Sequence, residues 1–89
     1  MERKKEKFLI KLDKVIDAVR EEQKITDSYA FIPEIIEILE FMKKRIDANN
    51  DEKNKIIGGI GRIVTDSFTF SESKIGGRIL DIINDFSQT

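Results

Sequence analysis

All five glycines of this 89-residue chain lie in two short stretches, IIGGIGRIV at residues 56–64 and IGGRIL at residues 75–80. A glycine-rich turn binds phosphate when it joins a buried strand to a helix, because its backbone N–H groups then face the anion. The residues before Gly58 read DEKNKII, which is too charged for a central strand, and no GK[ST] follows the glycines. The pattern therefore does not predict a nucleotide site, and we expect the glycines to lie in or beside helices.

The polar run DANNDEKNKIIG at residues 47–58 has a partial likeness to a calcium-binding loop. Asp47, Asn49 and Asp51 occupy its first, third and fifth positions. The sixth position of such a loop needs Gly for a sharp turn, and the twelfth needs a bidentate Glu. Here these positions are Glu52 and Gly58, so we interpret the run as a turn between two helices.

The chain contains no Cys and no His, which excludes disulfides, thiolate and imidazole chemistry, and zinc sites built on these residues. Glu34, Glu37 and Glu40 therefore lack the Glu-x-x-His partners of a di-metal site and are expected on a solvated face. Ser73 and Lys74 cannot act as a dyad, because adjacent helical residues do not face each other. We predict that the protein is not an enzyme, with no catalytic, cofactor-binding or metal-binding residues and no evident small-molecule substrate.

The overall charge limits the classes of partner. Charged residues make up 37% of the chain but nearly cancel, with a net charge of −1, whereas dedicated nucleic-acid binders carry a clear basic excess. No apolar run approaches the roughly 18–20 residues that cross a bilayer. The N-terminal stretch MERKKEKFLIKLDK lacks the apolar segment and the cleavage site of a signal peptide. We expect a cytoplasmic protein with no membrane span, and nucleic acid is not the expected partner.

Apolar residues at helical spacing predict four helices, at about residues 4–24, 33–47, 51–67 and 72–86. They predict an all-α fold in a single domain, either a small four-helix bundle or an orthogonal helical array. Pro33 is expected at the first position of the second helix. Asn49 is expected as the N-cap of the third helix, and Thr69 or Ser71 as that of the fourth.

A strand over residues 62–70 is the alternative for RIVTDSFTF, because its apolar residues alternate with polar ones. A single strand would have no partner elsewhere in the chain, however, and an isolated strand is not stable. We therefore keep the helical interpretation of this segment.

The glycines of the third helix need an explanation, because each costs roughly 1 kcal/mol relative to Ala in a helix interior. A helical projection places Gly59 and Gly61 beside the apolar stripe, with Gly58 and Arg62 turned away from it. One interpretation is internal: the helix bends there, or it crosses the fourth helix closely at that helix's own glycine pair. The other interpretation is a surface on which a partner docks.

Three larger side chains share this ambiguity. Arg62 and Arg78 each follow a glycine group, and they could form ordinary surface pairs with Asp66 and Asp81 or anchor an interface. Tyr29 could fill the end of the bundle or contact a partner through its polar tip. The predicted partner-binding set is Gly58, Gly59, Gly61, Arg62, Gly76, Gly77, Arg78 and Tyr29.

The leading hypothesis is a non-enzymatic protein-interaction or regulatory module that binds a protein partner or a second copy of itself. The alternative is weak binding of nucleic acid or an anionic surface through the basic first helix, from Arg3 to Lys14, where Arg3, Lys4, Lys5 and Lys7 form a cluster. The small size, the abundance of Lys and Ile and the lack of Cys also loosely resemble bacterial immunity and antitoxin proteins. That resemblance implies an inhibitor of a partner protein.

Overall fold

The structure is a computed structural model that describes residues 2–25 and 29–88, with side chains except at positions 2, 3, 68 and 69. Within these residues it contains four long helices, one single-turn helix and no strand. The helices are α1 (Glu2–Ile25), α2 (Ile32–Lys44), α3 (Asn50–Asp66), α4 (Phe68–Ser71) and α5 (Lys74–Gln88). The predicted all-α four-helix fold is confirmed, and the strand alternative for residues 62–70 is wrong.

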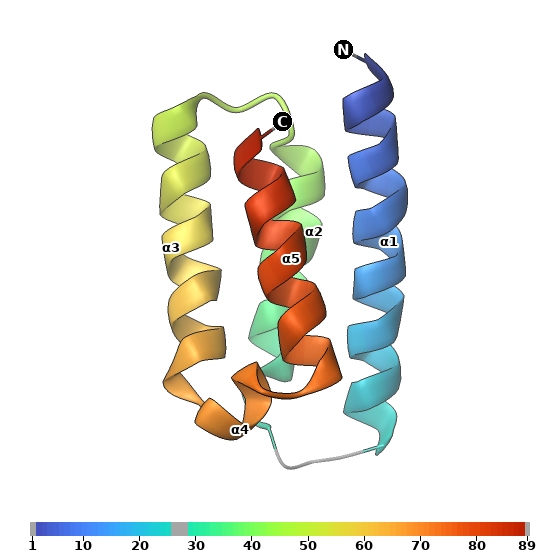
Figure 1. Ribbon diagram of the computed structural model, residues 1–89, viewed down its shortest axis with the longest axis vertical. Helices are drawn as coiled ribbons and strands as arrows, with labels where there is room; N and C mark the ends of the chain where they lie inside the picture. Colours follow the sequence, from blue (N-terminus) through green and yellow to red (C-terminus); the bar gives the residue numbers. More distant parts are fainter. Residues whose placement is uncertain (1, 26–28, 89) are drawn as a thin grey trace.

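The four long helices form a bundle rather than an orthogonal array, since they lie side by side along the long axis of the molecule (Figure 1). Each long helix packs on two others: α1 on α2 and α5, and α3 on α2 and α5. Helices that follow one another in the chain run in opposite directions, as short connections require. Their apolar stripes meet in one core, formed by Phe8, Leu12, Val15, Ile16, Val19, Ile32, Ile35, Leu39, Met42, Ile56, Ile60, Val64, Phe70, Ile79, Ile82, Ile83 and Phe86.

The ends of α2 and the start of α3 follow from local hydrogen bonds. Pro33 occupies the second rather than the first position of α2, because the helix begins at Ile32. The helix ends at Lys44, earlier than predicted, where the backbone N–H of Arg45 donates to two carbonyls of the last turn. The predicted N-cap of α3 is confirmed: the Asn49 side chain accepts a hydrogen bond of 2.9 Å from the N–H of Glu52.

The connection between α3 and α5 differs from the prediction, because α4 interrupts it. Phe70 is fully buried, and the single turn of α4 directs this ring into the core. The N-cap of α5 is Ser73, whose hydroxyl oxygen accepts from the N–H of Gly76 at 3.0 Å and donates to the carbonyl of Phe70 at 2.5 Å. Thr69 and Ser71, the predicted caps, both lie in α4; the side chain of Thr69 is outside the described part.

Aromatic rings fill both ends of the bundle. At the α4 end, the Phe70 ring meets the edges of Tyr29 and Phe31, with ring centroids 4.9 and 5.1 Å away. At the other end, Phe8 stacks on Phe86 at 5.6 Å. No helix in the described ranges has both the length and the apolar character to cross a membrane.

Candidate interaction surface

One glycine, Gly76, is required by internal packing. It is buried in the first turn of α5, directly beneath the backbone of α4. A Cβ at this position would overlap the carbonyl oxygen of Phe70 and lie 2.9 Å from the Cα of Ser71. The predicted close approach of two segments at a glycine therefore holds here, although the neighbour is α4 rather than α3.

The other four glycines, Gly58, Gly59, Gly61 and Gly77, have a different environment. A Cβ added at any of them would meet no atom within 4 Å. The prediction that these glycines permit a close helix crossing inside the molecule is therefore wrong. Glycine in a helix costs up to about 1 kcal/mol relative to Ala. At these four positions the missing side chain does not make room for another part of the chain, so no close packing offsets that cost.

Two of these glycines share one side of α3. Residues three, four and seven positions apart lie along the same face of a helix. This relation links Asn54, Gly58, Gly61 and Thr65. It also links Gly58 to the charged residues Lys55 and Arg62, which lie on the side of Gly58 away from Gly61. Gly59 lies on a different side of the helix, about 160° from Gly61. The Thr65 hydroxyl donates to the carbonyl of Gly61 at 2.8 Å, so its hydrogen-bonding capacity is directed to its own helix.

The adjacent side of α5 is placed by its ion pairs. Lys11 of α1 contacts both Asp81 and Asp85, so that side of α5 faces α1. Leu80 is turned about 100° away from Asp81, toward the neighbouring helix α3, and it lies half-buried against the core. Gly77 lies between Leu80 and Asp81 around the helix, about 60° from Leu80 and 40° from Asp81. We name the resulting set the glycine face: Asn54, Ile57, Gly58, Gly61 and Thr65 of α3 with Gly77 and Leu80 of α5.

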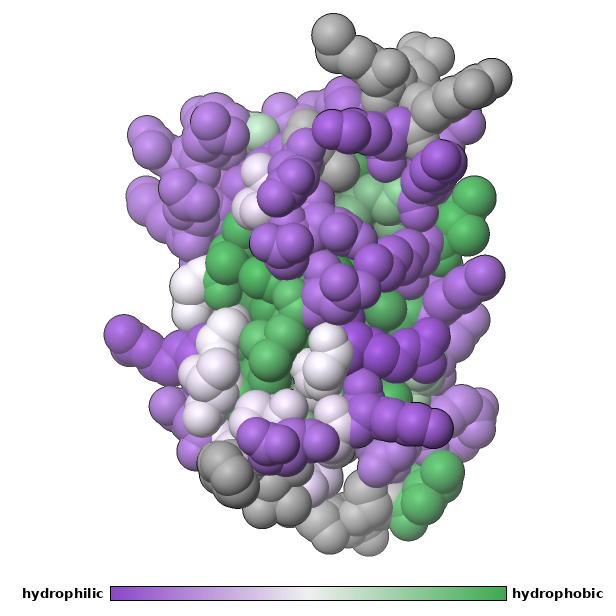
Figure 2. Space-filling view, viewed as in Figure 1, coloured by the Kyte–Doolittle hydropathy of each residue, from purple (hydrophilic) through white to green (hydrophobic). Residues whose placement is uncertain are grey.

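The seven residues of the glycine face are uncharged, and the charged residues nearest to them on α3 are Lys55 and Arg62 beside Gly58. Figure 2 shows apolar and pale side chains gathered over α3 and α5, within surroundings that are largely hydrophilic. Ile57 and Leu80 supply partly buried apolar surface to this region. A low, uncharged surface of this kind lets another backbone approach closely without desolvating a charge.

The two predicted arginines separate. Arg62 borders the glycine face on α3, whereas Arg78 precedes Asp81 by three residues and lies on the α1 side of α5. The pairs predicted with Asp66 and Asp81 are not present: within residues 2–25 and 29–88, neither arginine has a carboxylate within 4.0 Å. Asp81 binds Lys11 instead.

Tyr29 belongs to the aromatic cluster at the α4 end of the bundle. Its ring packs on Phe31 at 5.5 Å and on Phe70 at 4.9 Å, and it is half-buried. These contacts agree with the interpretation in which Tyr29 fills the end of the bundle. We therefore leave Tyr29 and the buried Gly76 out of the candidate surface.

A buried lysine was missed by the sequence prediction. Lys53 is only 5% exposed, and its ammonium lies 5.3 Å from the centre of the Phe86 ring, in cation–π geometry. The signal was present in the spacing, because Lys53 stands three, seven and eleven residues before Ile56, Ile60 and Val64. A lysine stem can cover apolar surface while its charged end stays near the boundary.

The basic start of α1 is partly neutralised by carboxylates of other helices and turns. Lys5 pairs with Asp47, and Lys11 with two aspartates of α5. The hydrogen bond from Lys5 lowers the pKa of Asp47. Asp47, considered above for a calcium loop, thus holds the turn before α3 against α1. Arg3, predicted in the same basic cluster, has no described side chain.

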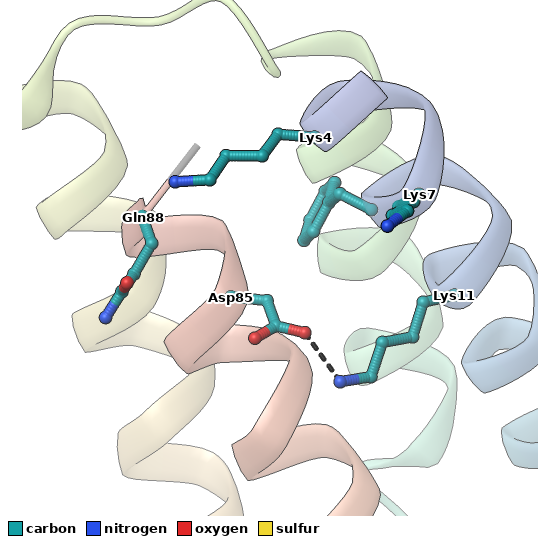
Figure 3. A pocket seen from close by; sticks show the side chains of 6 residues that line it. Lys4, Lys7, Lys11, Asp85 and Gln88 are labelled. Atoms are coloured by element: carbon teal, nitrogen blue, oxygen red, sulfur yellow. Dashed lines mark hydrogen bonds and ion pairs between the residues drawn. The ribbon is translucent and has the colours of Figure 1, made fainter. Parts of the chain in front are cut away.

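A hollow of about 210 Å³ lies beside this cluster, between the start of α1 and the end of α5 (Figure 3). Lys4, Lys7 and Lys11 border it together with Asp85, and its floor is Phe8, which is 3% exposed. The C-terminal end of a helix carries a partial negative charge. Asp85 and the C-terminal end of α5 would both repel an anion. The hollow therefore gives little support to the alternative that this region binds nucleic acid or an anionic surface.

The contact between Lys11 and α5 predicts a pH dependence. The Lys11 ammonium donates hydrogen bonds to Asp81 and Asp85, over 2.5 and 2.6 Å, and these bonds raise the pKa of Lys11, that to Asp81 the most. Because the pKa of Lys11 is higher in the folded state than in the unfolded state, its contact with the two aspartates stabilises the fold. This stabilisation is fully present below pH about 10.4, the ordinary pKa of lysine, and it is lost as the pH rises through the pKa of Lys11 in the folded state. We expect the melting temperature of the native protein to fall more between neutral pH and strongly alkaline pH than that of Lys11→Arg, which stays charged. Equal falls in thermal melts of the two proteins would contradict the assignment.

Comparison with known proteins adds no relative to these observations: no protein-family model, no curated protein and no solved structure matches the chain.

Proposed function

We propose that this chain is a protein-interaction module whose glycine face docks a protein partner. The observation that carries the proposal is the open space around Gly58 and Gly61. Both occupy a helix that Ala would stabilise, and apart from the adjacent residues and backbone of α3 itself, no atom lies within 4 Å of where the Cβ of an Ala would be. A backbone that approaches from outside would account for both glycines, because only glycine leaves that space free.

The surrounding chemistry is consistent with binding rather than catalysis. The glycine face presents amide, hydroxyl and aliphatic groups, and none of its seven residues has an acidic or basic side chain. Groups that do acid–base work have pKa values tuned by their surroundings. Arg62, at the border of the face, is of the residue type most often found as an anchor at interface hot spots.

Site-specific photo-crosslinking in the host cell tests the proposal. We expect a photoreactive amino acid at Thr65, on the glycine face, to form a discrete protein adduct. The same amino acid at Glu37, exposed on α2, should form none and serves as the control. The adduct at Thr65 should disappear when Gly58 and Gly61 are replaced by Ala.

Gly59→Ala is the matched control for those replacements. Gly59 lies on the same helix with equally open surroundings but on a different side. All the alanine variants should be as stable as the native protein or more stable, by up to about 1 kcal/mol per replacement. If Gly59→Ala abolished the adduct equally, or if Thr65 and Glu37 gave the same adducts, the glycine face would not be the docking surface.

A further inference from the structure

Two opposite charges border the glycine face on the outer edge of α3. Lys55 and Asp66 are both exposed and stand eleven positions apart, which is about three turns, so they lie on the same edge of the helix. In the described part of the chain, neither has an oppositely charged partner within 4.0 Å.

The spacing of these two charges defines a register. When two copies of a helix pack antiparallel about a two-fold axis, a residue that lies some positions before the axis in one copy faces the residue that lies equally many positions after it in the other copy. The midpoint between Lys55 and Asp66 falls between Ile60 and Gly61. A two-fold axis at that point places Lys55 of each copy beside Asp66 of the other, and it places the glycines where the two backbones come closest.

We propose that the partner of the glycine face is a second copy of this chain, bound with α3 antiparallel to α3 of its partner. This inference rests on the proposed function and adds the identity of the partner. The face is complementary to itself at its edge, where Lys55 and Asp66 carry opposite charges that pair only in the antiparallel register.

Charge exchange within the chain gives a test specific to self-association. We expect sedimentation equilibrium to show a reversible dimer of the native protein. Lys55→Glu should place two carboxylates opposite each other at both ends of the interface, and Asp66→Lys two ammonium groups. Each single variant should weaken the dimer roughly tenfold, because two attractive pairs become repulsive. The double variant K55E/D66K restores both pairs and should dimerise as well as the native protein.

Mixing the two single variants is a further arm of the experiment. K55E carries only acidic and D66K only basic groups at these positions, so the mixture should form a heterodimer more tightly than either variant forms a homodimer. Both positions are exposed, and circular dichroism of each variant should show the native helix content. A native protein that stays monomeric up to its solubility limit would overturn the proposal, as would a dimer that neither exchange affects.

The two proposals can fail separately. If Thr65 crosslinks to a different protein while the chain sediments as a monomer, the docking surface stands and the second copy is excluded. If Thr65 gives no adduct and the chain is a monomer, both proposals fall.

Discussion

Gly76→Ala is expected to lower the free energy of unfolding by about 3 kcal/mol, as overpacking against a fixed neighbour does. The added Cβ would overlap the carbonyl oxygen of Phe70, which belongs to the backbone of α4 and cannot rotate away as a side chain could. The N–H of Gly76 also donates to the capping hydroxyl of Ser73. Relief of the overlap would therefore displace either the start of α5 or the buried ring of Phe70.

The adjacent glycine provides the matched control for this prediction. Gly77 is exposed, and a Cβ there would meet nothing within 4 Å. Gly77→Ala should leave the stability unchanged or raise it by up to about 1 kcal/mol, since Ala is the better helix former. Urea denaturation of both variants measures the difference. Equal effects of the two replacements would show that α4 does not pack on α5 as described.

Phe70→Ala is expected to cost about 3–5 kcal/mol, the range for deleting a fully buried aromatic side chain. The ring of Phe70 is completely inaccessible to solvent and makes edge contacts with both Tyr29 and Phe31. Its removal would leave a cavity at the α4 end of the bundle and expose two aromatic rings to water. In a domain of this size, such a loss approaches the whole stability of the fold.

Phe41→Ala is the control for the loss of an aromatic ring. Phe41 is 42% exposed and lies beneath the guanidinium of Arg45 at 5.4 Å, so its removal should cost less than about 1 kcal/mol. Chemical denaturation would separate the two variants clearly. A similar cost for both replacements would contradict the role of Phe70 in closing the bundle.

The sequence by itself determined the fold class and the main helices. The apolar stripes of residues 4–24, 33–47, 51–67 and 72–86 have a helical period, and burying four such stripes together leaves a bundle as a simple solution. The N-cap at Asn49 was predictable because the capping hydrogen bond is local, spanning only three residues. The exclusions drawn from the missing Cys and His are likewise properties of composition.

The tertiary structure alone decided which face of each helix is free, because that depends on neighbours distant in the chain. Gly76 and Gly77 are adjacent in sequence, yet one lies beneath the backbone of α4 and the other meets no atom. The sequence around the two glycines does not distinguish them. They differ because Gly76 faces the backbone of Phe70 and Gly77 does not. The pairing of Asp81 with Lys11 rather than Arg78 has the same origin, since the packing of α1 on α5 brings the lysine within reach. The glycines of IIGGIGRIV were visible as an anomaly from the start, but whether they lay inside the bundle or on its surface depended on where α5 packs against α3.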